Sequence, residues 1–128
     1  MKRFGFGQSR LRVEDQRFVT GHGTYTDDIN LTGQSYGWVV RSLLPHADVT
    51  VDAGAARDMP GIRLVLTASE MAAQGVGAMV CGFMPEGAKP PRPRPVIADQ
   101  RTRHAGEALA FVVADSLVQA RDAAEAVL

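Results

Sequence analysis

The chain has 128 residues, which is enough for one compact domain whose core needs no disulfide. Its 14 Lys and Arg residues balance 14 Asp and Glu residues, and the basic residues are scattered along the sequence. This distribution argues against a phosphate track for nucleic acid or an anionic membrane surface as the main partner, and a neutral chain favours self-association.

The sequence carries one cysteine, Cys81, which excludes an intrachain disulfide and fits a reducing compartment. His22, His46 and His104 lie far apart and do not have the spacing of zinc ligands. The N-terminus lacks the apolar segment of a secretory signal, and no window approaches the ~20 apolar residues of a membrane span. We therefore expect a cytoplasmic protein without a membrane span.

Residues 1–35 are predicted to form an extended N-terminal arm. The run Gly21-His22-Gly23 permits tight turns and interrupts a helix, and among the preceding residues only Phe18 and Val19 are typical of a strand. Residues 36–128 are predicted to form the folded domain.

This domain begins with strand patterns. Residues 36–41 are aromatic and β-branched, which favours a pleated, half-buried environment. Residues 48–52 alternate between polar and apolar, so Val49 and Val51 should face one side of a second strand. Residues 62–66 form an almost continuous apolar run, which predicts a strand buried on both faces.

Two short helices are expected on either side of this third strand. Asp52 is placed to N-cap a helix over residues 53–57, which must end before Pro60. Thr67-Ala68-Ser69-Glu70 has the pattern of a capping box, and Gly75 is the expected end of the second helix.

Residues 75–95 are rich first in Gly and Met and then in alternating Pro and Arg, which predicts a long exposed loop. Ala108–Ala114 is the most apolar stretch and is predicted to be the central strand. Ser116 and Gln119 form a second capping box for a helix that runs to the chain end. The apolar positions of this helix recur at helical spacing: Leu117, Ala120, Ala124 and Val127. This order of elements predicts an α+β domain.

Several groups have residue types that carry chemistry in other proteins. The glycine pairs at 5–7 and 21–23 resemble phosphate-binding glycines, but neither has the strand, third glycine and helix of a dinucleotide fingerprint or the Lys-Ser/Thr pair of a P-loop. We interpret both as turns. His22, His46 and His104 titrate near neutrality, yet none has an identifiable Ser, Cys or Asp partner, so loop hydrogen bonding is their expected role.

The remaining candidates also have structural interpretations. Cys81 has no flanking cation or helix N-terminus to activate its thiol, which is typical of an inert residue. Asp27-Asp28 supply too few oxygens for a calcium site and are expected to order a turn, with Arg41 or another basic side chain as a partner. Arg103 and Glu107 are spaced for a surface ion pair worth under ~1 kcal/mol.

The segment Pro90–Pro95 leaves a second function open. Alternating proline and arginine favours the pre-ordered polyproline conformation that aromatic grooves recognise. The alternative to a structural domain is therefore a stand-alone interaction module that uses Pro90–Pro95 as a ligand.

Six segments, taken in order, resemble one family. They are Arg10-x-Arg12-x-Glu14-Asp15 with Phe18-Val19-Thr20-Gly21-x-Gly23-x-Tyr25-x-Asp27-Asp28, Arg41-Ser42 with His46-Ala47, Pro60-Gly61 with Val65-Leu66-Thr67, Arg103-His104-x-Gly106-Glu107, Phe111-Val112-Val113-Ala114, and Ala120-x-x-Ala123-Ala124-Glu125. In this order they resemble the N-terminal a/b hammerhead domain of molybdenum hydroxylase large subunits, which include xanthine dehydrogenase, aldehyde oxidase and the large chain of aerobic carbon monoxide dehydrogenase. Leu43-Leu44-Pro45 departs from the pattern, since the family more often has proline directly after Arg-Ser.

The resemblance implies an a/b hammerhead fold with a mixed sheet and two to three helices over residues 36–128. It implies a structural domain of an enzyme that hydroxylates aldehydes or heterocycles or oxidises CO, with a molybdopterin-type molybdenum cofactor and with iron-sulfur and FAD-binding subunits or domains as partners. The family's cofactor motifs and its glutamate base lie in the downstream catalytic domains, so Glu107 is not that base. We expect no catalytic, cofactor-binding or metal-binding residue in this chain, which alone should be inactive.

The family continues beyond the last helix into a further strand. The domain is therefore expected to be truncated at its C-terminal edge, and the chain to be a fragment. A missing strand would leave an apolar edge beside the helix that starts at Ser116, and homo-oligomers would form through this edge.

Overall fold

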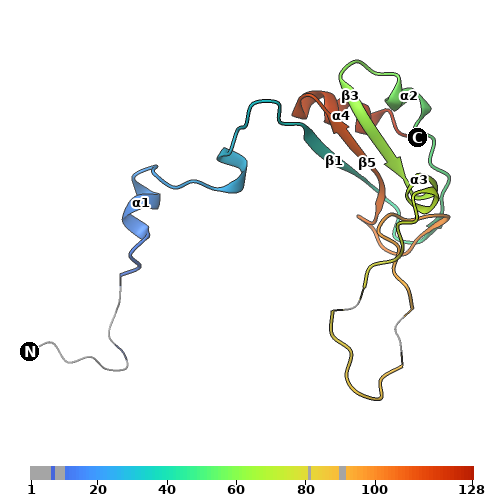
Figure 1. The fold of residues 1–128 in the computed structure, drawn as a ribbon, viewed down its shortest axis with the longest axis horizontal. Coiled ribbons are helices and arrows are strands. Elements are labelled where there is room, and N and C mark those ends of the chain that lie inside the picture. Colours follow the sequence, from blue (N-terminus) through green and yellow to red (C-terminus); the bar gives the residue numbers. More distant parts are fainter. Residues whose placement is uncertain (1–6, 8–10, 81, 90–91) are drawn as a thin grey trace, which may run out of the picture. The chain divides into compact units, whose positions relative to one another are not determined.

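The computed structural model describes residues 7, 11–80, 82–89 and 92–128. Its contacts divide the chain into two compact units, Met1–Gly33 and Gln34–Leu128. Figure 1 shows the elements of both units along the sequence. No helix of the described residues is long and apolar enough to cross a membrane.

The first unit contains the helix α1 (Asp15–Val19) and the short 3-10 helix η1 (Thr26–Asp28), neither with a buried residue. The prediction that Phe18 and Val19 are strand-like was wrong, because both belong to α1. Gly21, at a φ of 74°, comes after the helix and ends it. The N–H groups of Gly21 and His22 donate to the carbonyls of Phe18 and Arg17, which is how a left-handed glycine closes a helix.

The second unit is built on a three-stranded sheet with the order β1 (Tyr36–Arg41), β5 (Ala108–Ala114), β3 (Ile62–Thr67). The predicted position of Ala108–Ala114 as the central strand is confirmed, and so is the α+β class. The expected mixed pairing is not found, because both neighbours of β5 run antiparallel to it. β1 and β3 point the same way but do not pair with each other.

A second, two-stranded ladder joins β2 (Ala47–Asp48) to β4 (Arg101–Thr102). The predicted strand over 48–52 is only partly confirmed, since ladder pairing ends at Asp48. The expected alternation does hold, with Val49 and Val51 half-buried and their polar neighbours exposed. The sequence gives no indication of β4, because a two-residue strand is too short for any period to show.

Three helices lie in the described part of the second unit: α2 (Gly54–Arg57), α3 (Ala68–Ala73) and α4 (Leu117–Glu125). The predicted capping box of α3 is confirmed, and the Thr67 N–H donates to Glu70 Oε2 at 2.7 Å. That of α4 is confirmed only as an N-cap: Ser116 Oγ accepts from the Gln119 N–H at 3.3 Å, while the Gln119 side chain bonds to the Ser116 hydroxyl and the Pro60 carbonyl. The predicted N-cap of α2 is one residue off. Ala53 holds that position, while the Asp52 carboxylate accepts from the Gly54 N–H at 2.8 Å.

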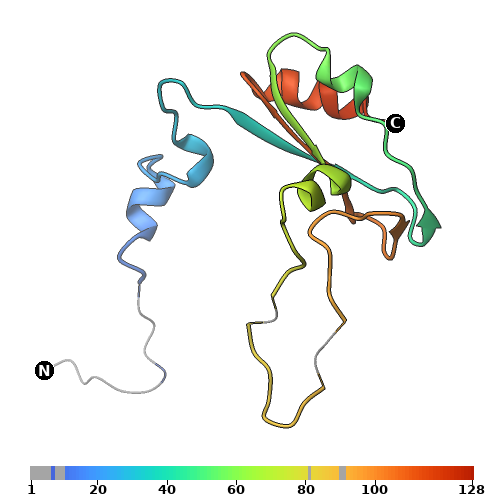
Figure 2. The same ribbon diagram turned by 45° about the vertical axis from the view of Figure 1, so that its right-hand side comes forward.

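The core lies on one face of the sheet, between the strands and the helices α2 and α4. Figures 1 and 2 show both helices on this side. Its central strand residues are Val65 and Val112, and its buried helix residues are small. The core cluster is Ala53, Ala56, Val65, Val112, Ala123 and Ala124. Small alanine side chains let α2 and α4 pack against the strands, so this face is buried along β5, while Trp38 at its β1 edge stays 37% exposed.

Candidate functional site

The opposite face of the sheet is an apolar surface that the described second unit leaves partly uncovered. Val39, Leu64, Leu66, Phe111 and Val113 share this face by their registers across β5. Leu64 is 43% exposed, and the other four are half-buried. The prediction that residues 62–66 are buried on both faces was therefore wrong for the chain by itself, because Leu64 stays exposed while Val65, on the side of α2 and α4, is 4% exposed.

Gly37 makes this face continuous across β1. A Cβ atom built on Gly37 would lie 2.5 Å from Cζ of Phe111, so the aromatic ring lies directly over the glycine backbone. The missing side chain leaves room for the tip of the Phe111 ring against the strand. We name the residues Gly37, Val39, Leu64, Leu66, Phe111 and Val113 the open face.

A pocket of about 570 Å³ brings together residues that are far apart in the sequence. Its lining residues come from the end of β1, from the long loop and from the turn before β5: Arg41, Met79, Arg92, Pro93, Arg94, Pro95, Val96, Arg103, His104, Gly106, Glu107 and Ala108. The charged residues of this lining are four arginines and one glutamate. We call this the arginine pocket.

Backbone contacts of the described residues position three of these arginines. Arg41 ends β1, and its Nη1 donates to the Gly106 carbonyl at 2.8 Å. Arg94 is placed by the Met79 N–H, which donates to the Arg94 carbonyl at 2.8 Å. The Arg103 N–H donates to Glu107 Oε2. The arginine backbones are therefore held by the sheet and by the base of the loop.

The predicted pair of Arg103 and Glu107 is confirmed, with Arg103 Nη1 3.3 Å from Glu107 Oε1. His104 Nδ1 lies 3.8 Å from Glu107 Oε2. The Glu107 side chain is only 12% exposed, and this burial acts to raise its pKa. The hydrogen bonds from the Arg103 N–H and guanidinium outweigh burial and hold the pKa of Glu107 below its ordinary value. Glu107 is thus an ionised partner of Arg103 near neutral pH.

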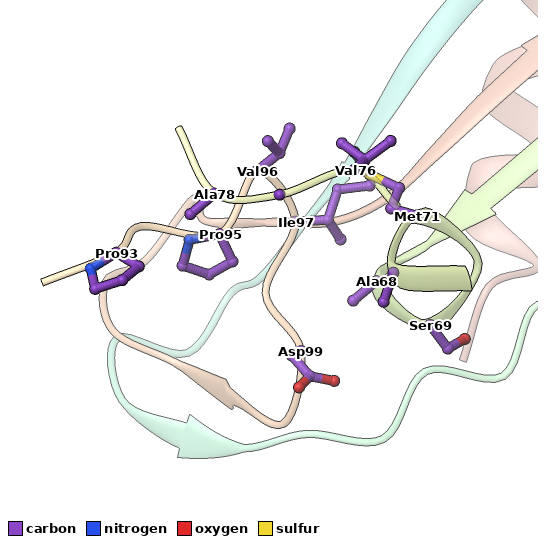
Figure 3. A pocket seen from close by; sticks show the side chains of 12 residues that line it. Ala68, Ser69, Met71, Val76, Ala78, Pro93, Pro95, Val96, Ile97 and Asp99 are labelled. Carbon is purple, nitrogen blue, oxygen red and sulfur yellow. The ribbon is translucent and has the colours of Figure 1, made fainter. Parts of the chain in front are cut away.

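A second, smaller pocket of about 280 Å³ lies between α3 and the base of the long loop. Figure 3 shows Met71 and Val76 beside Ile97, with Pro95 and Ala78 on the loop side. Ser69 and Asp99 add oxygen atoms to the lining. Pro93 and Pro95 line both pockets, so the proline segment separates an apolar hollow from a cationic one.

The other sequence candidates are not among the lining residues of these two pockets. His22 Nδ1 lies 3.0 Å from the Thr20 hydroxyl in an exposed loop, in line with its expected role. Asp28 Oδ2 accepts from the Tyr25 N–H at 2.8 Å, which confirms that the aspartate pair orders a turn. His46 is exposed beside β2. Gly5 of the 5–7 pair, Cys81 and the first two prolines of Pro90–Pro95 lie outside the described residues.

A molybdenum cofactor finds no matching donor set in the part of the chain that the structure describes. No three His, Cys, Asp or Glu side chains are grouped there, and no buried side-chain nitrogen or oxygen lacks a hydrogen-bond partner. We therefore assign none of these residues to the cofactor and derive no step through it.

Comparison with known proteins gives the same family in sequence and in structure. The family profile described as "Aldehyde oxidase and xanthine dehydrogenase, a/b hammerhead domain" matches residues 20–128. The chain is 38% identical over 122 residues to the nicotine 6-hydroxylase large subunit of Paenarthrobacter nicotinovorans, covering 94% of this chain and 15% of that protein. It is 37% identical over 124 residues to the carbon monoxide dehydrogenase large chain of Afipia carboxidovorans, covering 96% and 14%.

The solved structure of quinoline 2-oxidoreductase from Pseudomonas putida 86 superposes with a TM-score of 0.79 at 35% identity, over 95% of this chain and 15% of that one. The chain thus spans about one seventh of the length of these relatives.

Proposed function

Because the chain belongs to the aldehyde oxidase and xanthine dehydrogenase family, as its a/b hammerhead domain, we propose that it is the N-terminal structural domain of a molybdenum-dependent hydroxylase large subunit. Its task is to pack against the catalytic domains of the same subunit and to help shape the approach of the substrate. The open face is the observation that carries this proposal.

The open face supports packing because its side chains are those of a buried sheet. The segment Ala108–Ala114 is apolar at every position, so both faces of this strand carry apolar side chains. Such strands are typical of sheets that are covered on both faces. Complete burial of a Leu or Phe side chain contributes about 1.5–3 kcal/mol, so the part of these five side chains that is still in contact with water favours association. The matched relatives are several times longer than this chain, which supplies a covering surface within one polypeptide.

Leu64→Glu in the full-length large subunit tests this packing, with Leu117→Glu as the matched control. Leu64 is 43% exposed on the open face, and Leu117 is 38% exposed on α4, on the opposite side of the sheet. We expect Leu64→Glu to lower the melting temperature of the subunit and to open it to limited proteolysis, while Leu117→Glu leaves both unchanged. Equal behaviour of the two variants would show that the open face faces solvent in the subunit.

The enzyme's reaction is proposed from its relatives. Their names describe a nicotine 6-hydroxylase, a carbon monoxide dehydrogenase and a quinoline 2-oxidoreductase. We infer hydroxylation of an activated carbon, in an aldehyde or a heterocycle, or oxidation of CO. When bound in the catalytic domains, a molybdopterin-type cofactor supplies the oxygen transfer, and iron-sulfur and FAD-binding subunits or domains accept the electrons. The 128-residue chain by itself is expected to be inactive; stoichiometric molybdenum or turnover in the purified chain would contradict this.

Two further predictions stand beside the packing role. The interaction-module alternative predicts that deletion of residues 90–95 abolishes partner binding, whereas the structural domain should dock to the catalytic part without them.

Self-association through the edge beside α4 predicts dimers in sedimentation at high concentration, and a strict monomer would contradict it.

A further inference from the structure

The arginine pocket concentrates positive charge in a chain whose formal net charge is zero. Four arginines and one glutamate line it, so three positive charges are in excess even with His104 neutral. Glu107 compensates Arg103, with which it forms an ion pair. Arg92 and Arg94 have no side-chain hydrogen bond or ion pair to another of the described residues. Clefts lined by one sign of charge attract counter-charged ligands.

The guanidinium groups retain donors for a ligand. Arg41 uses one N–H on the Gly106 carbonyl, and a guanidinium carries five. The planar fork of arginine matches the oxygens of carboxylate and phosphate groups in a bidentate way. An excess of three charges exceeds what one carboxylate neutralises and suits a group that carries two negative charges.

The pocket also has an apolar wall. Met79, Pro93, Pro95 and Val96 line it beside the arginines. Its volume of about 570 Å³ lies in the range of roughly 300–1,000 Å³ that small-molecule sites occupy. A bare inorganic ion would leave this wall unused, whereas an organic body attached to the anion would contact it.

We propose that the arginine pocket binds an organic phosphate monoester, with the phosphate on Arg41, Arg94 and Arg103 and the organic group against the wall of Met79, Pro95 and Val96. Arg92 adds long-range attraction. The site is separate from the open face, so this inference does not depend on the packing role.

A titration of the full 128-residue chain with phenyl phosphate, followed by NMR of the backbone amides, tests the proposal. We expect saturable shifts at residues 41, 94 and 103–107, and binding about tenfold weaker in Arg94→Gln, which removes one charge-assisted contact. Arg63→Gln is the control, because Arg63 lies on β3 in an ion pair with Asp115 and not in the pocket. It should bind like the parent. Thermal unfolding of Arg94→Gln should match that of the parent, since its guanidinium forms no hydrogen bond or ion pair with another described residue.

Comparison ligands test the two parts of the site separately. Inorganic phosphate should bind more weakly than phenyl phosphate, because it lacks the organic group, and benzoate should bind more weakly because it carries one charge. If inorganic phosphate binds as tightly as phenyl phosphate, the apolar wall does not contribute to binding. If benzoate binds as tightly as phenyl phosphate, the pocket does not prefer a dianion. Shifts that do not saturate, or equal losses in Arg94→Gln and Arg63→Gln, would overturn the site itself.

Discussion

The two faces of the β1-β5-β3 sheet are alike in amino-acid type and differ in what covers them. On one face, Ala110, Val112 and Ala114 of β5 are completely buried beneath the helix layer. On the other, Phe111 and Val113 of the same strand are only half-buried. Apolar sequence therefore does not tell whether the cover belongs to the same domain. It indicates that both faces of the strand are suited to burial. On the open face, this domain supplies no packing layer that buries the side chains as completely as α2 and α4 bury the other face.

The largest difference in stability between the two faces is expected when a charged side chain is introduced on the buried face. Val112→Asp places an unpaired carboxylate in a position with no solvent exposure. We expect the free energy of unfolding to fall by more than about 4 kcal/mol, so that the domain no longer folds. Denaturant titration followed by circular dichroism measures this loss.

The neighbouring residue is the control for this prediction. Val113→Asp introduces the same side chain one position along β5, on the open face. The expected loss is about 1 kcal/mol, from the poor strand propensity of aspartate. If both variants unfold alike, the two faces are equally buried and the distinction between them fails.

A smaller effect is expected where β1 meets the aromatic ring of the open face. Gly37→Ala puts a Cβ 2.5 Å from Phe111 Cζ, so the ring must move away. We expect a loss of about 1 kcal/mol, because an overpacking cost of roughly 1–3 kcal/mol is partly offset by the lower entropy of the unfolded alanine chain.

Gly77→Ala is the matched substitution for this test. A Cβ at Gly77 meets nothing within 4 Å, and its φ is not positive. This variant should unfold at the same denaturant concentration as the parent or a slightly higher one. A Gly37→Ala variant as stable as Gly77→Ala would mean that the Phe111 ring does not lie on the strand.

The smallest effect is expected at the end of β3, where Glu70 caps α3. Partial burial acts to raise the pKa of Glu70, but hydrogen bonds from the Thr67 N–H and hydroxyl and the charge of Arg57 hold the pKa below its ordinary value of 4.5. A lowered pKa in the folded state contributes stability above pH 4.5 that is lost as the pH falls through the folded pKa.

Glu70→Gln should therefore reduce the free energy of unfolding by about 0.5 kcal/mol at pH 7, the lower end of the range for a helix cap, and by less as the pH falls below about 4.5. Unfolding titrations at several pH values measure the difference. Glu86→Gln, in the exposed loop, is the control and should change nothing at any pH. A loss in Glu70→Gln that stays constant down to pH 3 would show that the ionised carboxylate is not what caps α3.

Local pattern predicted most of the elements because their signals are short-range. The aromatic and β-branched residues 36–41 form β1, and the apolar run Ala108–Ala114 forms β5. A capping box begins α3 and the Ser116 N-cap begins α4 where predicted. The helix α1 was missed because Gly21 was interpreted as an interruption, whereas its positive φ closes the turn before it.

What sequence determined by itself is the identity of the domain and the order of its elements, since motifs and periodicity are written in consecutive residues. Two properties were decided by tertiary structure alone. The helices α2 and α4 pack on the same side of the sheet, which left the other side open. The sheet and the base of the long loop bring Arg41, Arg94 and Arg103 together, although they are scattered in sequence. Both properties depend on contacts between residues that are far apart in the sequence. The arginine pocket forms because the fold brings the end of β1, the base of the long loop and the turn before β5 close together.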